Sequence, residues 1–177
     1  MQRRQVLAGA AGLLMTPFAA RAQDDIAKNI INVPADGWTI YGPQTKKAVK
    51  DKTAQSGRAI EVKLPGTAAN MWEAAAQTAI IKPIKAGDKI VGAAWLRALT
   101  DAGGPANLNL RLQINSAPYT ELKQVSVSVG PDWKLYSVEA VATQDYAANT
   151  TVMVIHLASA KQTVWLGPGF VLDMGKA

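Results

Sequence analysis

The chain has 177 residues, with 19 Lys and Arg, 13 Asp and Glu, one histidine and no cysteine. This length indicates one domain, and the lack of cysteine excludes disulfides, thiolate catalysis, iron–sulfur clusters and Cys-ligated zinc. Hydrophobic residues make up 49% and charged residues 18% of the chain, which favours a packed core over disorder.

Residues 1–22 have the features of a signal peptide. Arg3 and Arg4 precede an apolar run that ends at Ala20, and Ala20-Arg21-Ala22 is a small-x-small cleavage pattern. The run is about 15 residues long, shorter than the roughly 20 that a membrane-spanning helix needs. We therefore expect cleavage near Ala22-Gln23, export by the Sec or the twin-arginine route, and a periplasmic or extracellular protein without a membrane span. The alternative is an uncleaved N-terminal anchor.

The predicted domain covers residues 23–177. Three of the 19 basic residues lie in the signal segment, which leaves 16 against 13 acidic residues. A nucleic-acid-binding protein usually concentrates its basic residues on one face and interleaves aromatic ones, so we expect no nucleic-acid partner. The main basic cluster consists of Lys46, Lys47, Lys50 and Lys52, and Asp51 interrupts it. We expect this cluster to lie on a solvated edge or loop.

Short segments with period-2 alternation predict half-buried strands along the whole domain. The clearest example has Leu108, Leu110 and Leu112 on one face, with polar residues between them. Gly167-Pro168-Gly169 is expected to be a turn between two strands. The alanine run at 74–76 favours a helix by propensity, but its setting favours a strand. The predicted strands are residues 58–64, 74–81, 90–98, 108–115, 124–129, 135–143, 151–157, 163–166 and 170–174.

Many short strands separated by Gly and Pro predict an all-β fold, an antiparallel sandwich or barrel. The common catalytic patterns are missing from this sequence. It has no Gly-x-Ser-x-Gly motif, and no spacing marks the pair of carboxylates that a glycosidase uses. His156 shares a strand face with Val152 and Val154, where a packing role is favoured over a catalytic one. We therefore expect a protein that is not an enzyme.

The aromatic and polar residues leave two interpretations open. Sugar rings stack on aromatic side chains, and their hydroxyls form hydrogen bonds with planar polar groups. A tryptophan is equally common in the core of a β-sandwich. Trp95 and Arg97 share one strand face, and we expect Arg111, Gln113 and Asn115 on a neighbouring strand on the same side. Such a surface suits hydroxyl recognition, and it also suits an ordinary solvated sheet. The tryptophans of the predicted domain are Trp38, Trp72, Trp95, Trp133 and Trp165.

A series of motifs from about Trp38 to Met174 resembles the cellulose- and xylan-binding modules of the carbohydrate-binding family 4/9 group. The resemblance implies an antiparallel β-sandwich of the galactose-binding-like jelly-roll type. Such modules accompany bacterial xylanases and other secreted polysaccharide-degrading enzymes. The motifs are Gly57-Arg58-Ala59-Ile60-Glu61-Val62, Asn70-Met71-Trp72-Glu73, Ile84-Lys85-Ala86-Gly87-Asp88, Ala94-Trp95-Leu96-Arg97-Ala98, Ala117-Pro118-Tyr119, Asp132-Trp133-Lys134-Leu135-Tyr136, Asp145-Tyr146, His156-Leu157-Ala158 and Gln162 to Pro168.

The resemblance also implies site residues. It implies structural roles for Trp133 and Tyr136. It implies no catalytic residue, and a structural calcium is the one cofactor that it suggests. Asp173 is the candidate ligand for that calcium, although its usual acidic partner near the start of the domain is not evident. The implied carbohydrate contacts are Trp72, Glu73, Arg97, Arg111, Gln113, Tyr119, His156 and Gln162.

The leading expectation is an exported, non-catalytic protein that binds a polysaccharide or oligosaccharide of the xylan or β-glucan type and assists glycoside hydrolysis. One alternative is a structural or protein-interaction sandwich of the cell envelope that binds no sugar, for which the sequence names no protein partner. The other is a small glycan-cleaving enzyme.

Overall fold

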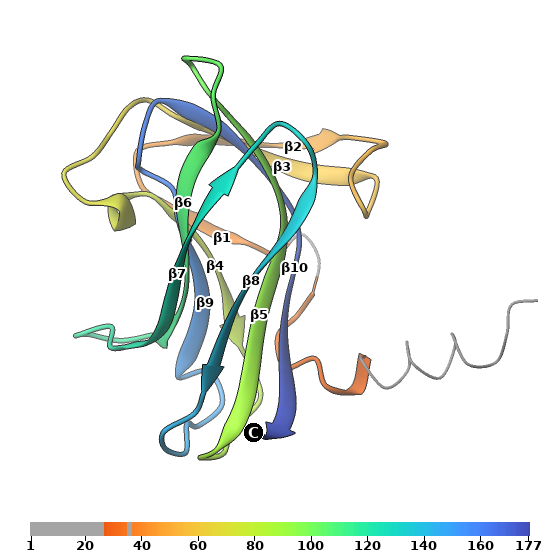
Figure 1. Cartoon of the computed structure of the whole chain (residues 1–177), viewed down its shortest axis with the longest axis vertical. Helices are drawn as coiled ribbons and strands as arrows, with labels where there is room; N and C mark the ends of the chain where they lie inside the picture. The colour runs from red at the N-terminus through yellow and green to blue at the C-terminus, as the bar shows by residue number, and fades with distance from the viewer. Residues whose placement is uncertain (1–26, 35–36) are drawn as a thin grey trace, which may run out of the picture.

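In the part of the chain that the structure describes, ten β-strands form two five-stranded sheets (Figure 1). The computed structural model describes residues 27–34 and 37–177. The predicted signal peptide, residues 1–22, lies outside these residues.

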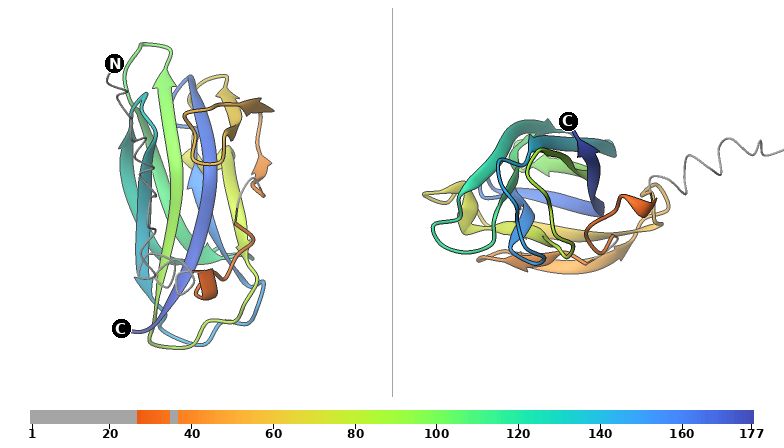
Figure 2. Two further views of the ribbon diagram at one scale, coloured as in Figure 1. Left: turned by 90° about the vertical axis from the view of Figure 1, so that its right-hand side faces the viewer. Right: turned by 90° about the horizontal axis from the view of Figure 1, so that it is seen from below.

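The first sheet has the order β1-β4-β9-β6-β7, and the second has the order β2-β3-β10-β5-β8. All neighbouring strands are antiparallel, and the two sheets stack face to face (Figure 2). The predicted antiparallel β-sandwich is therefore confirmed. The strands are β1 (Thr39–Tyr41), β2 (Thr45–Lys50), β3 (Arg58–Leu64), β4 (Ala75–Ile80), β5 (Asp88–Thr100), β6 (Ala106–Ile114), β7 (Glu121–Val129), β8 (Lys134–Val141), β9 (Thr151–His156) and β10 (Gln162–Lys176).

Alternating side chains build the core between the sheets. Leu108, Leu110 and Leu112 of β6 are fully buried and meet apolar side chains from the second sheet, such as Val164 and Leu166 of β10. Because successive side chains of a strand point to opposite faces, the polar residues between the leucines face outward. The alanine run also lies in a strand, as predicted, since β4 starts at its second alanine.

Strand β9 is buried on both of its faces. Met153 and Ile155 belong to the core, while Val152 and Val154 alternate with them and are equally buried. Side chains of the neighbouring strands β4 and β6 that point to the same outer face must therefore cover these two valines. This cover marks the outer face of the first sheet as more than a plain solvated surface.

The Gly167-Pro168-Gly169 segment corrects one prediction, because it is not a turn. It lies inside β10, where the pairing with β5 shifts register between Leu166 and Gly169. Close packing of Trp38 explains why residue 169 is a glycine, since a Cβ at this position would lie 2.4 Å from Trp38 Cζ2. Trp38 Nε1 also donates to the Gly167 carbonyl at 2.9 Å. Gly169 thus lets the Trp38 indole approach a bulged strand.

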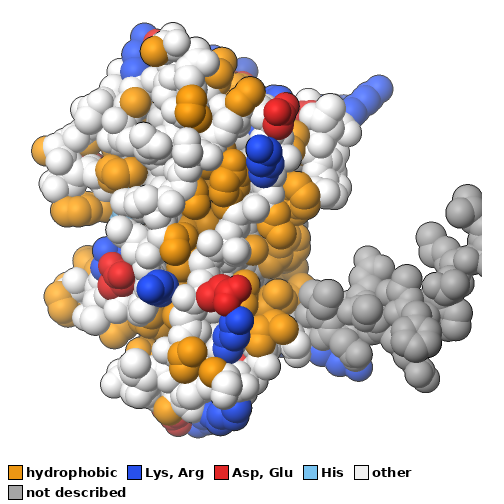
Figure 3. Space-filling model, in the orientation of Figure 1, with side chains coloured by type: hydrophobic (Ala, Val, Ile, Leu, Met, Phe, Trp, Pro, Cys, Tyr) orange, Lys and Arg blue, Asp and Glu red, His pale blue; other side chains and the backbone are white. Residues whose placement is uncertain are grey.

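Three of the four lysines of the basic cluster lie on an edge strand. Lys46, Lys47 and Lys50 belong to β2 and are exposed, and among the described strands β2 pairs with β3 alone. Lysines on an edge strand oppose pairing with other chains. Figure 3 shows that, on the face turned to the viewer, Lys and Arg side chains are dispersed and several lie beside Asp or Glu. Among the described residues, no helix is long and apolar enough to cross a membrane.

Candidate functional site

A cleft of about 670 Å³ lies on the outer face of the first sheet. Its residues come from four strands, from the 3₁₀ turn η1 (Met71–Glu73), and from the loop between β6 and β7. The residues that line it are Tyr41, Trp72, Gln77, Arg111, Gln113, Asn115, Pro118, Tyr119 and His156.

Strand register places the polar floor of the cleft. Gln77 on β4 and Arg111 on β6 both pair with Val154 of β9, so these three residues form one row across the sheet. Gln113 lies beside Val152 in the next row and is 7% exposed. The floor therefore alternates buried valines with planar amide and guanidinium groups.

Trp72 and Tyr41 stand on one side of the cleft. Trp72 is 55% exposed, and its ring centroid lies 6.4 Å from that of His156, edge-on at 64°. Tyr41 ends β1 and pairs with Ala75, which in turn pairs with His156. Both rings therefore flank the same end of the floor.

The turn that carries Trp72 is held at both ends. The Asn70 amide donates to Glu73 Oε1 at 3.0 Å, and Asn70 Nδ2 donates to the same oxygen at 3.1 Å, which closes a capping box. The Ala158 amide donates to the Met71 carbonyl at 3.2 Å. The exposed indole thus projects from a braced turn.

Tyr119 forms the opposite wall and is 53% exposed. The β6–β7 loop folds back over the sheet, and Arg111 Nη2 donates to the Tyr119 carbonyl at 2.8 Å. Tyr119 has a φ of 56°, and its amide donates to the Ser116 carbonyl at 2.6 Å. One floor residue therefore also positions one aromatic wall.

The described residues that line the cleft include one charged group, Arg111, and a neutral histidine. Burial, and to a lesser degree the nearby Arg111, lower the pKa of His156 to about 4, so its imidazole is neutral near pH 7 and can donate and accept hydrogen bonds. Burial, and to a lesser degree Tyr119, raise the pKa of Tyr41. No Asp or Glu is among the described residues that line the cleft, so these residues do not supply a glycosidase-type carboxylate pair.

The structure brings five of the eight predicted contact residues to this cleft: Trp72, Arg111, Gln113, Tyr119 and His156. They come from η1, β6, β9 and the β6–β7 loop. Aromatic faces on two walls and planar polar groups on the floor form the combination that a sugar ring requires, with apolar contact and a few directed hydrogen bonds.

Glu73 and Gln162 do not line the cleft. Glu73 faces the backbone and side chain of Asn70 as a cap. Gln162 is 1% exposed, and its Nε2 donates to the Leu157 carbonyl at 2.6 Å and to Ser159 Oγ at 3.1 Å. Both side chains stabilise turns beside the cleft, so we omit them from the candidate site.

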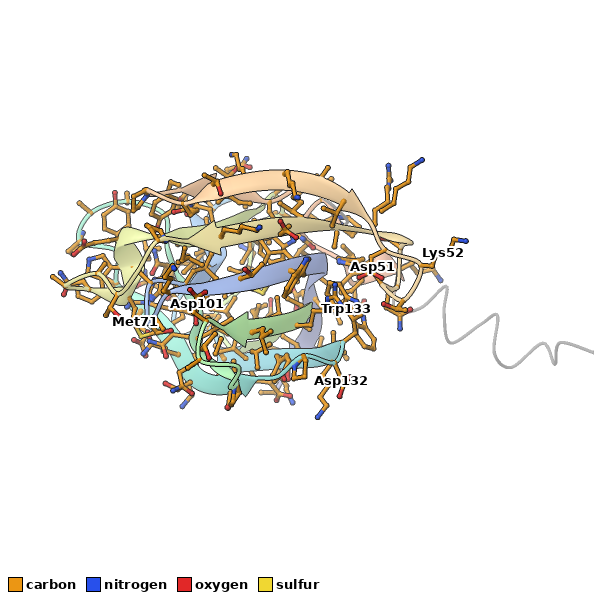
Figure 4. The ribbon with its side chains drawn as sticks, turned by 90° about the horizontal axis from the view of Figure 1, so that it is seen from above. Asp51, Lys52, Met71, Asp101, Asp132 and Trp133 are labelled. Carbon is orange, nitrogen blue, oxygen red and sulfur yellow. The ribbon has the colours of Figure 1, made fainter. Side chains whose placement is uncertain are left out.

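Arg97 lies on the outer face of the second sheet, and this corrects the expectation that its strand and the strand of Arg111 are neighbours. β5 and β6 belong to different sheets. The Arg97 guanidinium lies 4.5 Å from the ring centroid of Trp165 and 5.4 Å from that of Trp133. Its Nη2 is 3.2 Å from Asp51 Oδ2, which also accepts from Trp133 Nε1. Figure 4 shows Asp51 beside Trp133, with Met71 of η1 at the far side of the view.

Four lining residues were not predicted as contacts: Tyr41, Gln77, Asn115 and Pro118. β1 is only three residues long and gives no periodic signal. Gln77 carried a usable signal, because it is the one amide in the otherwise apolar and Thr-containing strand β4.

The predicted calcium ligand is engaged elsewhere. Asp173 Oδ1 accepts from the Gly175 amide at 2.9 Å. Among residues 27–34 and 37–177, no group of three or more His, Cys, Asp or Glu side chains is arranged to hold a metal ion. The described residues therefore do not gather around Asp173 the acidic ligands that calcium prefers.

Comparison with solved structures finds the same fold in carbohydrate-binding modules. A CBM4 structure has a TM-score of 0.59 at 16% identity, over 78% of this chain and 95% of that one. The N-terminal cellulose-binding domain of Cellulomonas fimi β-1,4-glucanase C has a TM-score of 0.54 at 18% identity, over 80% and 91%. The CBM22-1 and GH10 modules of a Clostridium thermocellum xylanase, solved with xylohexaose, have a TM-score of 0.57 at 15% identity, over 84% of this chain and 28% of that one.

No protein-family model and no curated protein match the sequence. The similarity to known proteins therefore comes from the solved structures, and it concerns the fold. The chain has the jelly-roll β-sandwich fold of these carbohydrate-binding modules.

Proposed function

We propose that the protein binds a polysaccharide or oligosaccharide in the cleft of the first sheet and does not cleave it. The observation that best supports this proposal is the arrangement of aromatic side chains around a floor of planar polar groups. Trp72 and Tyr41 stand on one side and Tyr119 on the other, above Gln77 and Gln113. These side chains supply stacking surfaces and both donors and acceptors for sugar hydroxyls.

The proposal extends to export and to a role beside polysaccharide-degrading enzymes. Residues 1–22 support export, since they carry the three regions of a signal peptide. The accessory role has support from the solved xylanase in which a module of this fold accompanies a GH10 module. We therefore propose a periplasmic or extracellular protein that holds a glycan of the xylan or β-glucan type.

Calorimetric titration of residues 23–177 with soluble xylan, mixed-linkage β-glucan, mannan, galactan and pectic polysaccharide tests the proposal. We expect saturable binding to at least one glycan and no release of reducing sugar. Lack of binding to the whole panel, in a protein that melts cooperatively, would refute it. Release of reducing sugar would instead favour the enzyme alternative.

A further inference from the structure

Arg111 stands out among the residues of the cleft, and it bears on which glycan is bound. It is the one charged side chain among the described residues that line the cleft. It rises from the middle row of the floor, next to Val154, and its side chain is 20% exposed. A charge held this far out of water needs a partner of opposite charge or several good hydrogen bonds.

The contacts of Arg111 leave that need partly unmet. Nη2 donates to the Tyr119 carbonyl, which carries no net charge. Among the described residues, the nearest carboxylate oxygen is Oε2 of Glu121, 3.8 Å from Nη1, beyond the 2.7–2.9 Å of a charge-assisted hydrogen bond. The Glu121 side chain is 45% exposed, so water screens it.

The second sheet provides a comparison within the same chain. Arg97 also lies on an outer sheet face, and Asp51 is 3.2 Å from it, with a side chain only 12% exposed. Two indoles stack on its guanidinium as well. Arg97 shows how this fold holds a structural arginine. Arg111 has neither a close, buried carboxylate nor a stacked ring among its described contacts.

We infer that the cleft takes a glycan that carries a carboxylate, such as a hexuronic acid unit, and that Arg111 binds this carboxylate. The inference rests on the proposed function and names its ligand class. A carboxylate matches the planar guanidinium fork, while the amides of Gln77 and Gln113 remain for hydroxyls. A neutral glycan would cover the guanidinium without supplying the missing negative charge, at a cost in affinity.

Two pairs of glycans test the inference on residues 23–177. One pair is oligogalacturonate and the same oligosaccharide after its carboxyl groups are reduced to alcohols. The other is glucuronoxylan oligosaccharide and its carboxyl-reduced form. We expect at least one acidic form to bind about tenfold more tightly than its reduced counterpart, equivalent to about 1.4 kcal/mol. The difference should shrink between 50 and 300 mM salt because charge contributes to binding.

Two substitutions assign the effect to the guanidinium. Arg111→Gln should abolish the preference for the acidic form, and Arg111→Lys should keep part of it. Lys134→Gln removes a positive charge from β8 in the second sheet and should leave both affinities unchanged. Near-ultraviolet circular dichroism and thermal melting verify that each variant is folded.

The outcomes separate this inference from the proposed function. Equal affinity for acidic and reduced forms would overturn the inference while the proposed function stands. Binding of no glycan would overturn both. An equal loss of affinity for both forms in Arg111→Gln would also overturn the inference, because Arg111 would then act only by positioning the Tyr119 loop.

Discussion

Truncating Trp72 is the most direct perturbation of the proposed binding site. An indole presents roughly 250 Å² of surface, so an exposure of 55% leaves about 140 Å² open. If a sugar ring covers half of that, at about 25 cal/mol per Å², the stacked contact contributes about 1.7 kcal/mol. Trp72→Ala should therefore weaken glycan binding about 15- to 20-fold.

Calorimetric titration with the tightest glycan of the panel measures this loss, and tryptophan fluorescence gives a second readout. In the native protein, saturating glycan should shift the emission, and Trp72→Ala should remove most of that shift. Leu135→Ala is the matched control, since Leu135 is 51% exposed and lies on β8 in the second sheet.

The stability of the variant separates stacking from folding. Trp72 is 55% exposed and is not part of the core cluster, so its truncation should leave cooperative melting intact. Native affinity in Trp72→Ala would refute the proposed site. An equal loss of affinity in Leu135→Ala would do the same, because a distant apolar side chain would then matter as much.

Three further predictions concern stability, and urea unfolding measures each. The pKa of His156 is lowered from 6.5 to about 4 in the fold, so its protonation favours the unfolded chain: stability should fall by at most about 3 kcal/mol as pH drops from 6.5 towards 4. His156→Gln should flatten that dependence, and an unchanged slope would contradict the reasoning. Asp51→Ala should destabilise the protein by about 2 kcal/mol, because it leaves a half-buried guanidinium without its carboxylate, yet glycan affinity should stay native; a lower affinity would contradict the structural role. Gly169→Ala should cost about 1–3 kcal/mol through its clash with Trp38. Gly66→Ala, where a Cβ meets nothing within 4 Å, should be near neutral, and equal losses in the two glycine variants would contradict this explanation.

Most of the fold could be predicted because alternation survives in the long strands. β6 carries leucines at every second position, and their burial follows from facing the second sheet. β2 escaped prediction because five of its six residues are exposed, so no face of it shows an apolar period. β10 was divided wrongly at Gly167-Pro168-Gly169, where glycine signals close approach of Trp38 rather than a turn. The residue that requires glycine at position 169 is Trp38, which is far away in the sequence. The local sequence therefore does not show why a glycine is needed there.

The site residues could be predicted only in part. Alternation shows which residues of a strand point away from the core, but it does not show to which of the two sheets the strand belongs. Arg97 and Arg111 have equivalent patterns in their strands, yet β5 and β6 lie in opposite sheets. One guanidinium is enclosed by two indoles and Asp51, and the other lines the cleft beneath Tyr119. Strand order is set by contacts between residues far apart in the chain, so only the assembled sheets could separate a structural arginine from a candidate ligand-binding one. Because of that separation, loss of the preference for acidic glycans in Arg111→Gln, with the preference kept in Lys134→Gln, tests the binding role of Arg111.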